Sequence, residues 1–281
     1  MTCIVISFPS FAQNAKTTTV DFNKKSQAAV KADYDMSGTI AEGAIRKKMT
    51  DAKIKGGSFK DGFITYQEVV IPEIRVEKMD VYFKIEDRKN TSSVFMLISK
   101  GYENFMSKES DPEVHDRAIA YLNALTTDIL RYGYNDEIVK NDLKIKDLEK
   151  DLKKAVKNGA SLSKDKTKTE GKAAENKNAI AKLKSDVENQ TKTLEFVKAK
   201  TGTVDQMESI KKEISKQEDA VKKATKNHEN AIEDAEDYRK DIEKTIAKIN
   251  ENLTEQEKLK NEIAGVKADN AVLKGKLDAL K

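Results

Sequence analysis

The apolar positions of the C-terminal third recur at alternating spacings of three and four residues. This is the heptad spacing of a coiled-coil seam, in which each apolar side chain packs against a neighbouring helix. Lys, Glu, Asp, Gln and Asn fill the positions between them, and no proline follows Pro112. The pattern therefore predicts long, paired helices. The seam positions are Met207, Ile210, Ile214, Val221, Ala224, Ala231, Ala235, Tyr238 and Ile242, followed by Leu259, Ile263, Val266, Leu273, Leu277 and Leu280.

A second seam precedes Gly202 and mirrors the one that follows it. We therefore predict an antiparallel hairpin with its tip at 201–203, where Thr203 caps the returning helix. Two heptad seams have a mirror centre every few residues, so the choice of Gly202 rests on its being a helix breaker. The predicted facing pairs are Leu194 with Ile210 and Leu183 with Val221.

The competing arrangement is a parallel dimer of extended helices. Asn270 lies on the seam, a placement that in parallel dimers pairs with its own copy and sets the register. Either arrangement begins at Asp111, as N-cap, and Pro112, at the first helical position. Gly133 is a candidate kink, and the stretch 158–171 is so poor in apolar residues that it is either a loop or a weak helix.

The N-terminal part of the chain has the pattern of a small α+β domain. Alternating and β-branched residues indicate strands, and a capping-box pair followed by an apolar face indicates one helix. We predict an antiparallel sheet with the helix on one face and Pro72 at an edge or bend. The expected elements are a strand at 27–32, a helix that starts at the Thr39–Glu42 capping box and ends before Gly56 and Gly57, and strands at 63–70, 81–85 and 94–98.

Composition places the domain boundary and limits the function. All Phe and Tyr residues except Phe196 and Tyr238 lie at or before Tyr134, which predicts a small α+β domain at 13–110 and a helical arm at 111–281. The net charge of +4 is the difference between 52 basic and 48 acidic residues that are finely interspersed. Such interspersion is typical of a solvated helix surface, so we expect no nucleic acid as a partner. Weak nucleic-acid binding by the Lys-rich arm stays an alternative function.

The first twelve residues resemble the end of a secretory signal that is cleaved after Ala12. The segment lacks a preceding Lys or Arg, and its apolar run is short, so an ordinary apolar terminus in a cytoplasmic protein is the alternative. We expect a periplasmic or secreted protein. Cleavage would remove Cys3, the only cysteine, and no run of apolar residues is long enough to predict a membrane span.

One stretch, 33–44, resembles an EF-hand calcium loop. Asp33, Asp35 and Ser37 match loop positions one, three and five, and a second partial match ends at Glu68. The first loop has Ala44 where a bidentate Glu should complete the coordination. A turn between a strand and a helix explains the same residues, and calcium binding stays the alternative.

Other candidate chemistry is scarce. The two histidines are interpreted as a solvated residue near a helix start, His115, and a polar seam position, His228. No glycine-rich phosphate loop, nucleophile elbow or metal-ligand cluster is found in the sequence. We therefore expect no catalytic residues and no cofactor.

The signal-like end at Ala12, the segments GFITYQEVVIPEI (62–74) and KMDVYFKIE (78–86), and the Lys-rich coiled coil resemble exported coiled-coil proteins of the Bacteroidota type. This resemblance implies export and brings no activity with it. The sequence thus favours a non-enzymatic structural or interaction protein. Its small domain would bind a protein partner, and its arm would act as a spacer, either as a monomeric hairpin or as a homo-oligomer.

The export hypothesis predicts the mature N-terminus. If the first twelve residues are a signal, the protein isolated from its native cell should begin at Gln13, because signal peptidase cuts after the small residue Ala12. Mass spectrometry of the intact native protein measures this. A native product that retains Met1 or Thr2 and fractionates with the cytosol would contradict the hypothesis.

Overall fold

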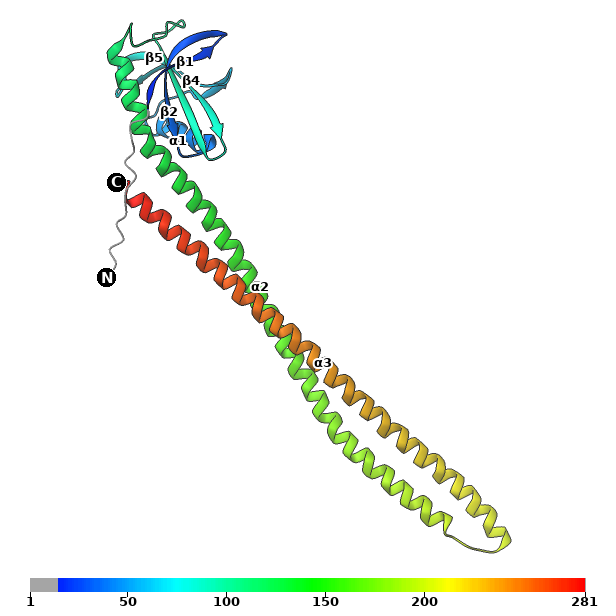
Figure 1. The fold of residues 1–281 in the computed structure, drawn as a ribbon. Helices are drawn as coiled ribbons and strands as arrows, with labels where there is room; N and C mark the ends of the chain where they lie inside the picture. Colours follow the sequence, from blue (N-terminus) through cyan, green and yellow to red (C-terminus); the bar gives the residue numbers. More distant parts are fainter. Residues whose placement is uncertain (1–14, 281) are drawn as a thin grey trace, which may run out of the picture. The chain divides into compact units, whose positions relative to one another are not determined.

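The computed structural model describes residues 15–280 and confirms the α+β class with a long helical hairpin (Figure 1). Six strands and three helices follow one another along the chain. The elements are β1 (Lys16–Phe22), β2 (Lys25–Tyr34), α1 (Gly38–Asp51), β3 (Ser58–Lys60), β4 (Phe63–Ile71), β5 (Arg75–Arg88), β6 (Thr91–Ser99), α2 (Pro112–Lys198) and α3 (Val204–Asp278).

The six strands form one antiparallel sheet in the order β1-β2-β6-β5-β4-β3. The strands predicted at 27–32, 63–70, 81–85 and 94–98 are all present, and Pro72 lies in the turn between β4 and β5. The edge strands β1 and β3 were missed. Asn23 and Lys24 join β1 to β2 with φ of 50° and 62°, and positive φ at both central residues is the geometry of a type I′ hairpin turn.

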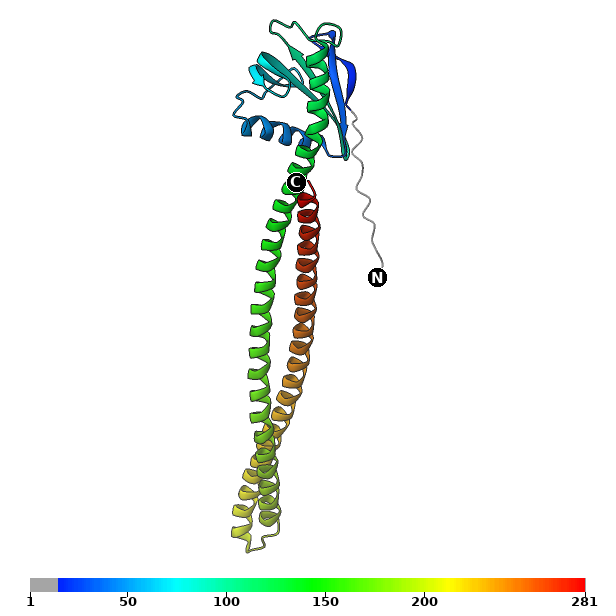
Figure 2. The same ribbon diagram turned by 90° about the vertical axis from the view of Figure 1, so that its left-hand side faces the viewer.

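One face of the sheet is covered by α1 and by the first turns of α2. Side chains from β2, β4, β5 and β6 pack with both helices into a continuous core, whose largest fully buried members include Phe83, Ile45 and Leu122. Figure 2 shows both helices beside the sheet. Burying these apolar side chains is the main stabilisation of this part of the chain.

The other face carries aromatic residues and is curved. Phe22 on β1 lies against Phe63 on β4, with ring centroids 5.2 Å apart, although three strands separate β1 from β4 in the sheet. Only a strongly coiled sheet brings those strands together. A β-bulge in β4 contributes, since the pairing with β5 shifts between Tyr66 and Val69, and Glu68 has a φ of 50°.

Helix α1 starts differently from the prediction. Its N-cap is Ser37, which makes no side-chain cap hydrogen bond, and the Thr39–Glu42 capping box is not formed. Instead, the backbone N–H of Gly38 donates to the carboxylate of Asp87 at 2.8 Å. A carboxylate at a helix N-terminus satisfies a free N–H and interacts favourably with the helix dipole.

Two glycines let α1 and α2 approach closely. A Cβ on Gly43 of α1 would lie 2.4 Å from the ring of Tyr132, and a Cβ on Gly133 of α2 would lie 3.1 Å from Met36 and Ile40. Gly133 therefore serves close packing within a continuous helix, which differs from the kink expected there. The hydroxyl of Tyr34 also donates to the carbonyl of Leu122 at 2.7 Å and fixes α2 on the sheet.

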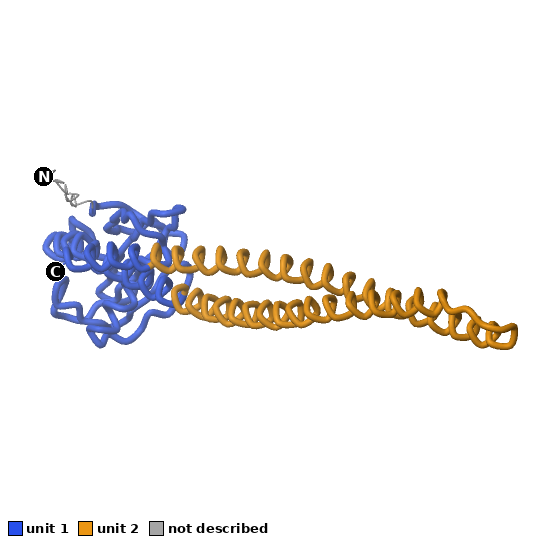
Figure 3. Tube along the Cα trace, turned by 90° about the horizontal axis from the view of Figure 1, so that it is seen from below, with its two compact units in different colours: residues 1–143, 267–281 blue, residues 144–266 orange. Residues whose placement is uncertain are grey.

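The chain divides into two compact units, which are coloured in Figure 3. Unit 1 contains residues 1–143 and 267–281, and unit 2 contains residues 144–266. The boundary predicted near residue 110 is thus too early, because α2 buries Ala118, Leu122 and Leu125 in the core of unit 1. In addition, the end of α3 contacts α2 within unit 1, where Arg131 donates to the carbonyl of Leu280.

The predicted antiparallel pairing of α2 with α3 is confirmed in both units (Figures 1 and 2). Residues 158–171 are helical, so the loop alternative for this stretch is wrong. Residues 199–203 connect the helices, and Thr203 precedes the first residue of α3, as predicted for its cap. The side chain of Gln206 accepts a hydrogen bond from the backbone N–H of Thr203, as in half of a capping box.

The register of the hairpin is shifted from the mirror about Gly202 by one heptad. Asn141 hydrogen bonds to Asn270 at 2.9 Å, whereas the mirror would place Ile263, seven residues earlier, opposite Asn141. The predicted pairing of Leu194 with Ile210 and of Leu183 with Val221 is therefore wrong, although both helices keep the predicted seam. Among the described residues, no helix is long and apolar enough to cross a membrane.

The close approach of the helices predicts a stability effect at Gly43. We expect Gly43→Ala to lower the free energy of unfolding by about 1–3 kcal/mol, because the new methyl overlaps Tyr132. Gly275→Ala is the matched control in the same unit. It lies in α3 with no atom within 4 Å of its Cβ, so it should raise stability by up to about 1 kcal/mol. Urea unfolding followed by circular dichroism measures both, and equal effects would contradict the packing argument.

Candidate functional site

A hollow of about 880 Å³ lies at the curved face of the sheet, and we call it the concave hollow. All of its residues belong to unit 1, and they come from the β1–β2 turn, β4, β5 and the segments that follow β3 and β6. The lining residues are Phe22, Asn23, Lys60, Asp61, Thr65, Gln67, Glu68, Lys78, Met79, Asp80, Tyr82, Lys100, Gly101, Tyr102 and Glu103.

An aromatic cluster forms the apolar wall of the concave hollow. The ring of Phe22 is at the centre of the cluster and makes edge-to-face contacts with Tyr82 and Phe105, at centroid distances of 4.9 and 5.1 Å. Phe63 supports the same ring from β4. Edge-to-face packing aligns the positive edge of one ring with the negative face of the next, so the cluster is rigid as well as apolar.

Polar groups surround this wall and are held by local contacts. The carboxylate of Asp80 accepts the backbone N–H of Glu68 at 2.8 Å, which ties the bulge of β4 to β5. The side chain of Glu68 pairs with Lys78 at 3.1 Å. On the opposite rim, the amide of Asn23 donates to Glu103 at 2.6 Å and joins the β1–β2 turn to the loop after β6.

Two carboxylates, Asp80 and Glu103, act on the phenol of Tyr82. Burial raises the pKa of its phenol, and the carboxylates of Asp80 and Glu103 raise that pKa further, because all three disfavour the tyrosinate. Since the folded-state pKa lies above that of the unfolded chain, Tyr82 favours the fold below pH ~10. That contribution is lost as the pH rises through the folded-state pKa.

The loop at the rim of the concave hollow has an unusual backbone. Gly101, Tyr102 and Glu103 have φ of 100°, 53° and 58°, so two consecutive residues with Cβ atoms lie in the left-handed region. Such conformations are unfavourable for residues with side chains and are concentrated at functional sites. The Tyr102 side chain is fully exposed. A strained loop thus presents an aromatic ring to solvent at the edge of a hollow.

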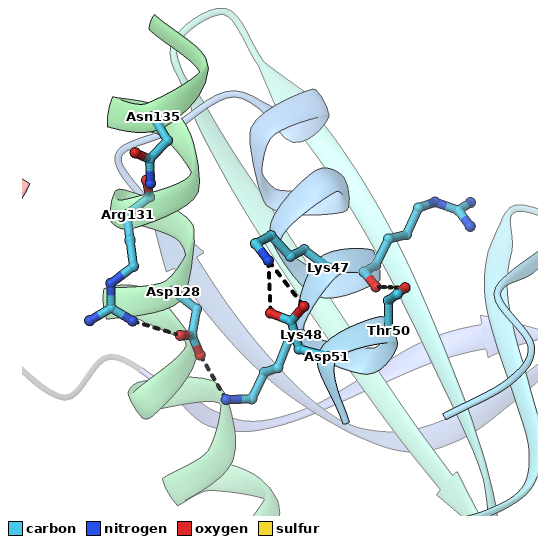
Figure 4. A network of polar contacts seen from close by, with 8 residues as sticks. Lys47, Lys48, Thr50, Asp51, Asp128, Arg131 and Asn135 are labelled. Carbon is cyan, nitrogen blue, oxygen red and sulfur yellow. Dashed lines mark hydrogen bonds and ion pairs between the residues drawn. The ribbon is translucent and has the colours of Figure 1, made fainter. Parts of the chain in front are cut away.

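A second hollow of about 540 Å³ lies between α1 and α2. Its charged side chains pair with one another (Figure 4). Asp128 accepts from Lys48 at 2.7 Å and lies 3.6 Å from Arg131, while Lys47 binds both oxygens of Asp51. These charges are therefore largely neutralised within the molecule.

The structure separates the three weak metal candidates. Asp33 lies on β2, where its carboxylate accepts from Ser93 and pairs with Lys31. Partial burial would raise its pKa, but those hydrogen bonds outweigh the effect and hold the pKa below the ordinary value. Asp35 follows in a bend, and Ser37 is the N-cap of α1. A helix that starts at loop position six is incompatible with an EF-hand loop of twelve residues.

The two histidines differ in burial. The interpretation of His115 as solvated is wrong, because its side chain is buried and its Nε2 lies 3.2 Å from the hydroxyl of Thr17. His228 lies in α3 at a half-buried seam position, as predicted. Over residues 15–280, no group of three or more His, Cys, Asp or Glu side chains is arranged to hold a metal ion.

Comparison with known proteins yields no relative. No family model, no curated protein and no solved structure matches the chain. The functional interpretation therefore depends on the concave hollow and on the hairpin alone.

The arrangement in the concave hollow is suited to recognition. It combines a rigid aromatic wall, a polar rim and one exposed ring, Tyr102, which together can exclude water from an apolar contact while offering hydrogen bonds around it. Sequence reasoning missed this site because its parts come from five segments. The signals that could have found it are the Asn23–Lys24 turn and the aromatic residues at 22, 63, 82 and 105.

The two carboxylates that act on Tyr82 predict a measurable titration. In a variant with Asp80→Asn and Glu103→Gln, the pKa of Tyr82 should fall, yet stay above about 10, because burial is the larger cause and is unchanged. NMR of the Tyr82 ring signals as a function of pH measures it. Asp51→Asn with Glu113→Gln, outside the concave hollow, is the control and should leave Tyr82 unchanged. An identical titration in both variants would contradict the assignment.

Proposed function

We propose that this chain is a non-enzymatic, exported interaction protein. In this proposal unit 1 binds a protein partner at the concave hollow, and the α2–α3 hairpin serves as a spacer or scaffold. The observation that carries the proposal is the fully exposed ring of Tyr102 on a left-handed backbone at the rim of that hollow.

Tyr102 has the properties of an interface anchor. Tyrosine is enriched at protein interfaces because a rigid ring contributes a large contact area with little loss of side-chain freedom. Its left-handed backbone costs about 1 kcal/mol or more, which the fold must offset elsewhere. A glycine would avoid that cost, and the presence of an aromatic residue there supports a role in binding.

The composition of the concave hollow favours a protein surface as the occupant. Its apolar wall is bordered by lysines and carboxylates, and an apolar centre with a polar, solvated rim is the usual anatomy of a protein–protein interface. The rim charges of both signs, such as Lys60 and Asp61, would contribute mainly to specificity and to the rate of encounter.

The hairpin has the properties of a spacer. Helices of 87 and 75 residues extend about 130 and about 110 Å at 1.5 Å per residue, and they bury their apolar seam against each other. Export is supported only by the signal-like residues 1–12, which lie outside the described residues.

The alternative functions receive less support. Lysines of the hairpin pair with acids, as in Lys198 with Glu218 and Lys200 with Glu213, which reduces their attraction for a polyanion. Calcium binding at 33–44 is disfavoured by the hydrogen bonds of Asp33 to protein groups.

Site-specific photocrosslinking in the native cell tests the proposal. A photoreactive phenylalanine analogue at Tyr102 should give a covalent adduct with one discrete protein, because the ring would lie in the interface. The matched control places the analogue at Val76, an exposed position on β5 that does not line the concave hollow. We expect at least about tenfold less adduct there, as for a residue outside an interface. Equal adduct at both positions, or none at Tyr102, would contradict the proposal.

A further inference from the structure

The heptad spacing of the two helices of the hairpin also permits a second register. Heptad seams run without interruption through α2 and α3. Sliding one helix by seven residues therefore brings seam positions opposite seam positions again. The mirror about Gly202 describes this second register, which differs from the observed one in the partners that polar residues face and in the contacts at the ends of the hairpin.

Two sets of polar contacts fit the observed register and not the second one, and we call them polar locks. The first is the pair Asn141 and Asn270. Asn270 is only 5% exposed, accepts a hydrogen bond from Asn141 at 2.9 Å and donates to Asp142 at 2.8 Å. In the second register Asn141 would face Ile263, and Asn270 would face Tyr134. The buried amide of Asn270 and the half-buried amide of Asn141 would then lose each other as partners, and a buried polar group without a hydrogen bond is strongly unfavourable.

The second polar lock is Asn252, which lies over Gly159. Its amide donates to the carbonyl of Ala155 at 3.1 Å, and its oxygen accepts from Gln256 at 2.7 Å. Only glycine leaves space for it, because a Cβ on Gly159 would lie 2.5 Å from the Asn252 oxygen. In the second register Asn252 would face Leu152. A helix-weakening glycine in mid-helix is thus explained by the side chain that it accommodates.

The ends of the hairpin show what the second register would gain. At the start of α3, Val204 is 88% and Met207 is 40% exposed, because the observed register gives these first turns no seam residue of α2. The second register would place Met207 opposite Val197. At the other end, Leu280 would move from Arg131 to Ala124, an exposed small residue on the same face of α2.

We propose that the hairpin is a two-register device, in which Asn141, Asn270 and Asn252 hold the observed register against a second one seven residues away. The slide between them moves α3 along α2 by about 10 Å at 1.5 Å per residue. The slide would give the first turns of α3 a partner on α2. At the C-terminal end it would break the contact of Arg131 with Leu280. Sliding of one packed element past another is an established means of carrying a signal along a protein.

Disulfide trapping in the full-length chain distinguishes the registers. In a Cys3→Ser background, Leu183→Cys with His228→Cys reports the observed register. Leu183→Cys with Val221→Cys reports the second. In the wrong register each pair is offset by one heptad, about 10 Å along the helix axis, which is beyond the reach of a disulfide. The rate of intramolecular closure under mild oxidation, read by mass spectrometry, measures how often each register is visited.

The decisive variant removes both locks with Asn141→Leu, Asn252→Leu and Asn270→Leu. We expect closure of the second-register pair to rise at least about tenfold, because leucine removes the penalty of the unpaired amides. The control replaces three exposed asparagines outside the seam, Asn189, Asn230 and Asn261, with leucine and should change neither rate. Circular dichroism confirms that each variant stays helical.

Two outcomes would overturn the proposal. If the variant without locks still closes only the observed-register pair, the register is fixed by other contacts. If the chain with its three asparagines intact forms both disulfides at equal rates, the asparagines do not select the observed register. Should the triple variant lose helicity, the double variant Asn141→Leu with Asn270→Leu gives the same comparison, since it replaces one facing pair of amides by a facing pair of leucines.

Discussion

The close contact between α1 and α2 is the constraint on which unit 1 depends. Tyr132 lies over Gly43, and Met36 and Ile40 lie over Gly133, so a Cβ at Gly43 would overlap Tyr132 and a Cβ at Gly133 would crowd its neighbours. This approach lets α2 bury Leu122 and Leu125 on the sheet and closes the core. Because the same helix continues into the hairpin, the packing that stabilises the small domain also fixes the helix on which the arm is built.

The helices cover one face of the sheet, and the other face buries itself by coiling. Phe22 and Phe63 meet across the coiled sheet, and the bulge at Glu68 bends β4 toward that contact. The concave hollow is the open end of this curve, so its aromatic wall and its position follow from the same packing requirement. A flat sheet would leave these rings exposed, whereas the coiled sheet leaves Tyr102 as the ring that faces solvent at the rim.

The sequence was sufficient where a local repeat carries the information and insufficient where distant residues decide. β-branched and aromatic residues located β4, alternation located β5, the polar turn at 87–92 located β6, and the heptads located the hairpin. The N-terminus of α1 was mispredicted because its first N–H binds Asp87, which is far away in the sequence. The burial of His115 depends on Thr17 of β1, a Thr-rich edge strand without a clear strand pattern. The register was mispredicted for another reason, since heptads repeat, and polar contacts between the helices, such as Asn141 with Asn270, distinguish one repeat from the next. The concave hollow left only scattered signals, the Asn23–Lys24 turn and four separate aromatic residues, and nothing local in the sequence joins them.

The antiparallel hairpin has a consequence for how the chain bears mechanical load. α2 begins in unit 1 and α3 ends there, so a force applied at the connecting residues 199–203 pulls on both helices. The backbone of α2 carries the force covalently, and between α2 and α3 the force acts through the seam. Such a force acts on α3 parallel to the seam. It therefore loads all the facing pairs of seam side chains at once and not one pair after another. Shear of many packed layers at once is far harder than peeling them apart, and the asparagine locks add resistance in the direction of sliding.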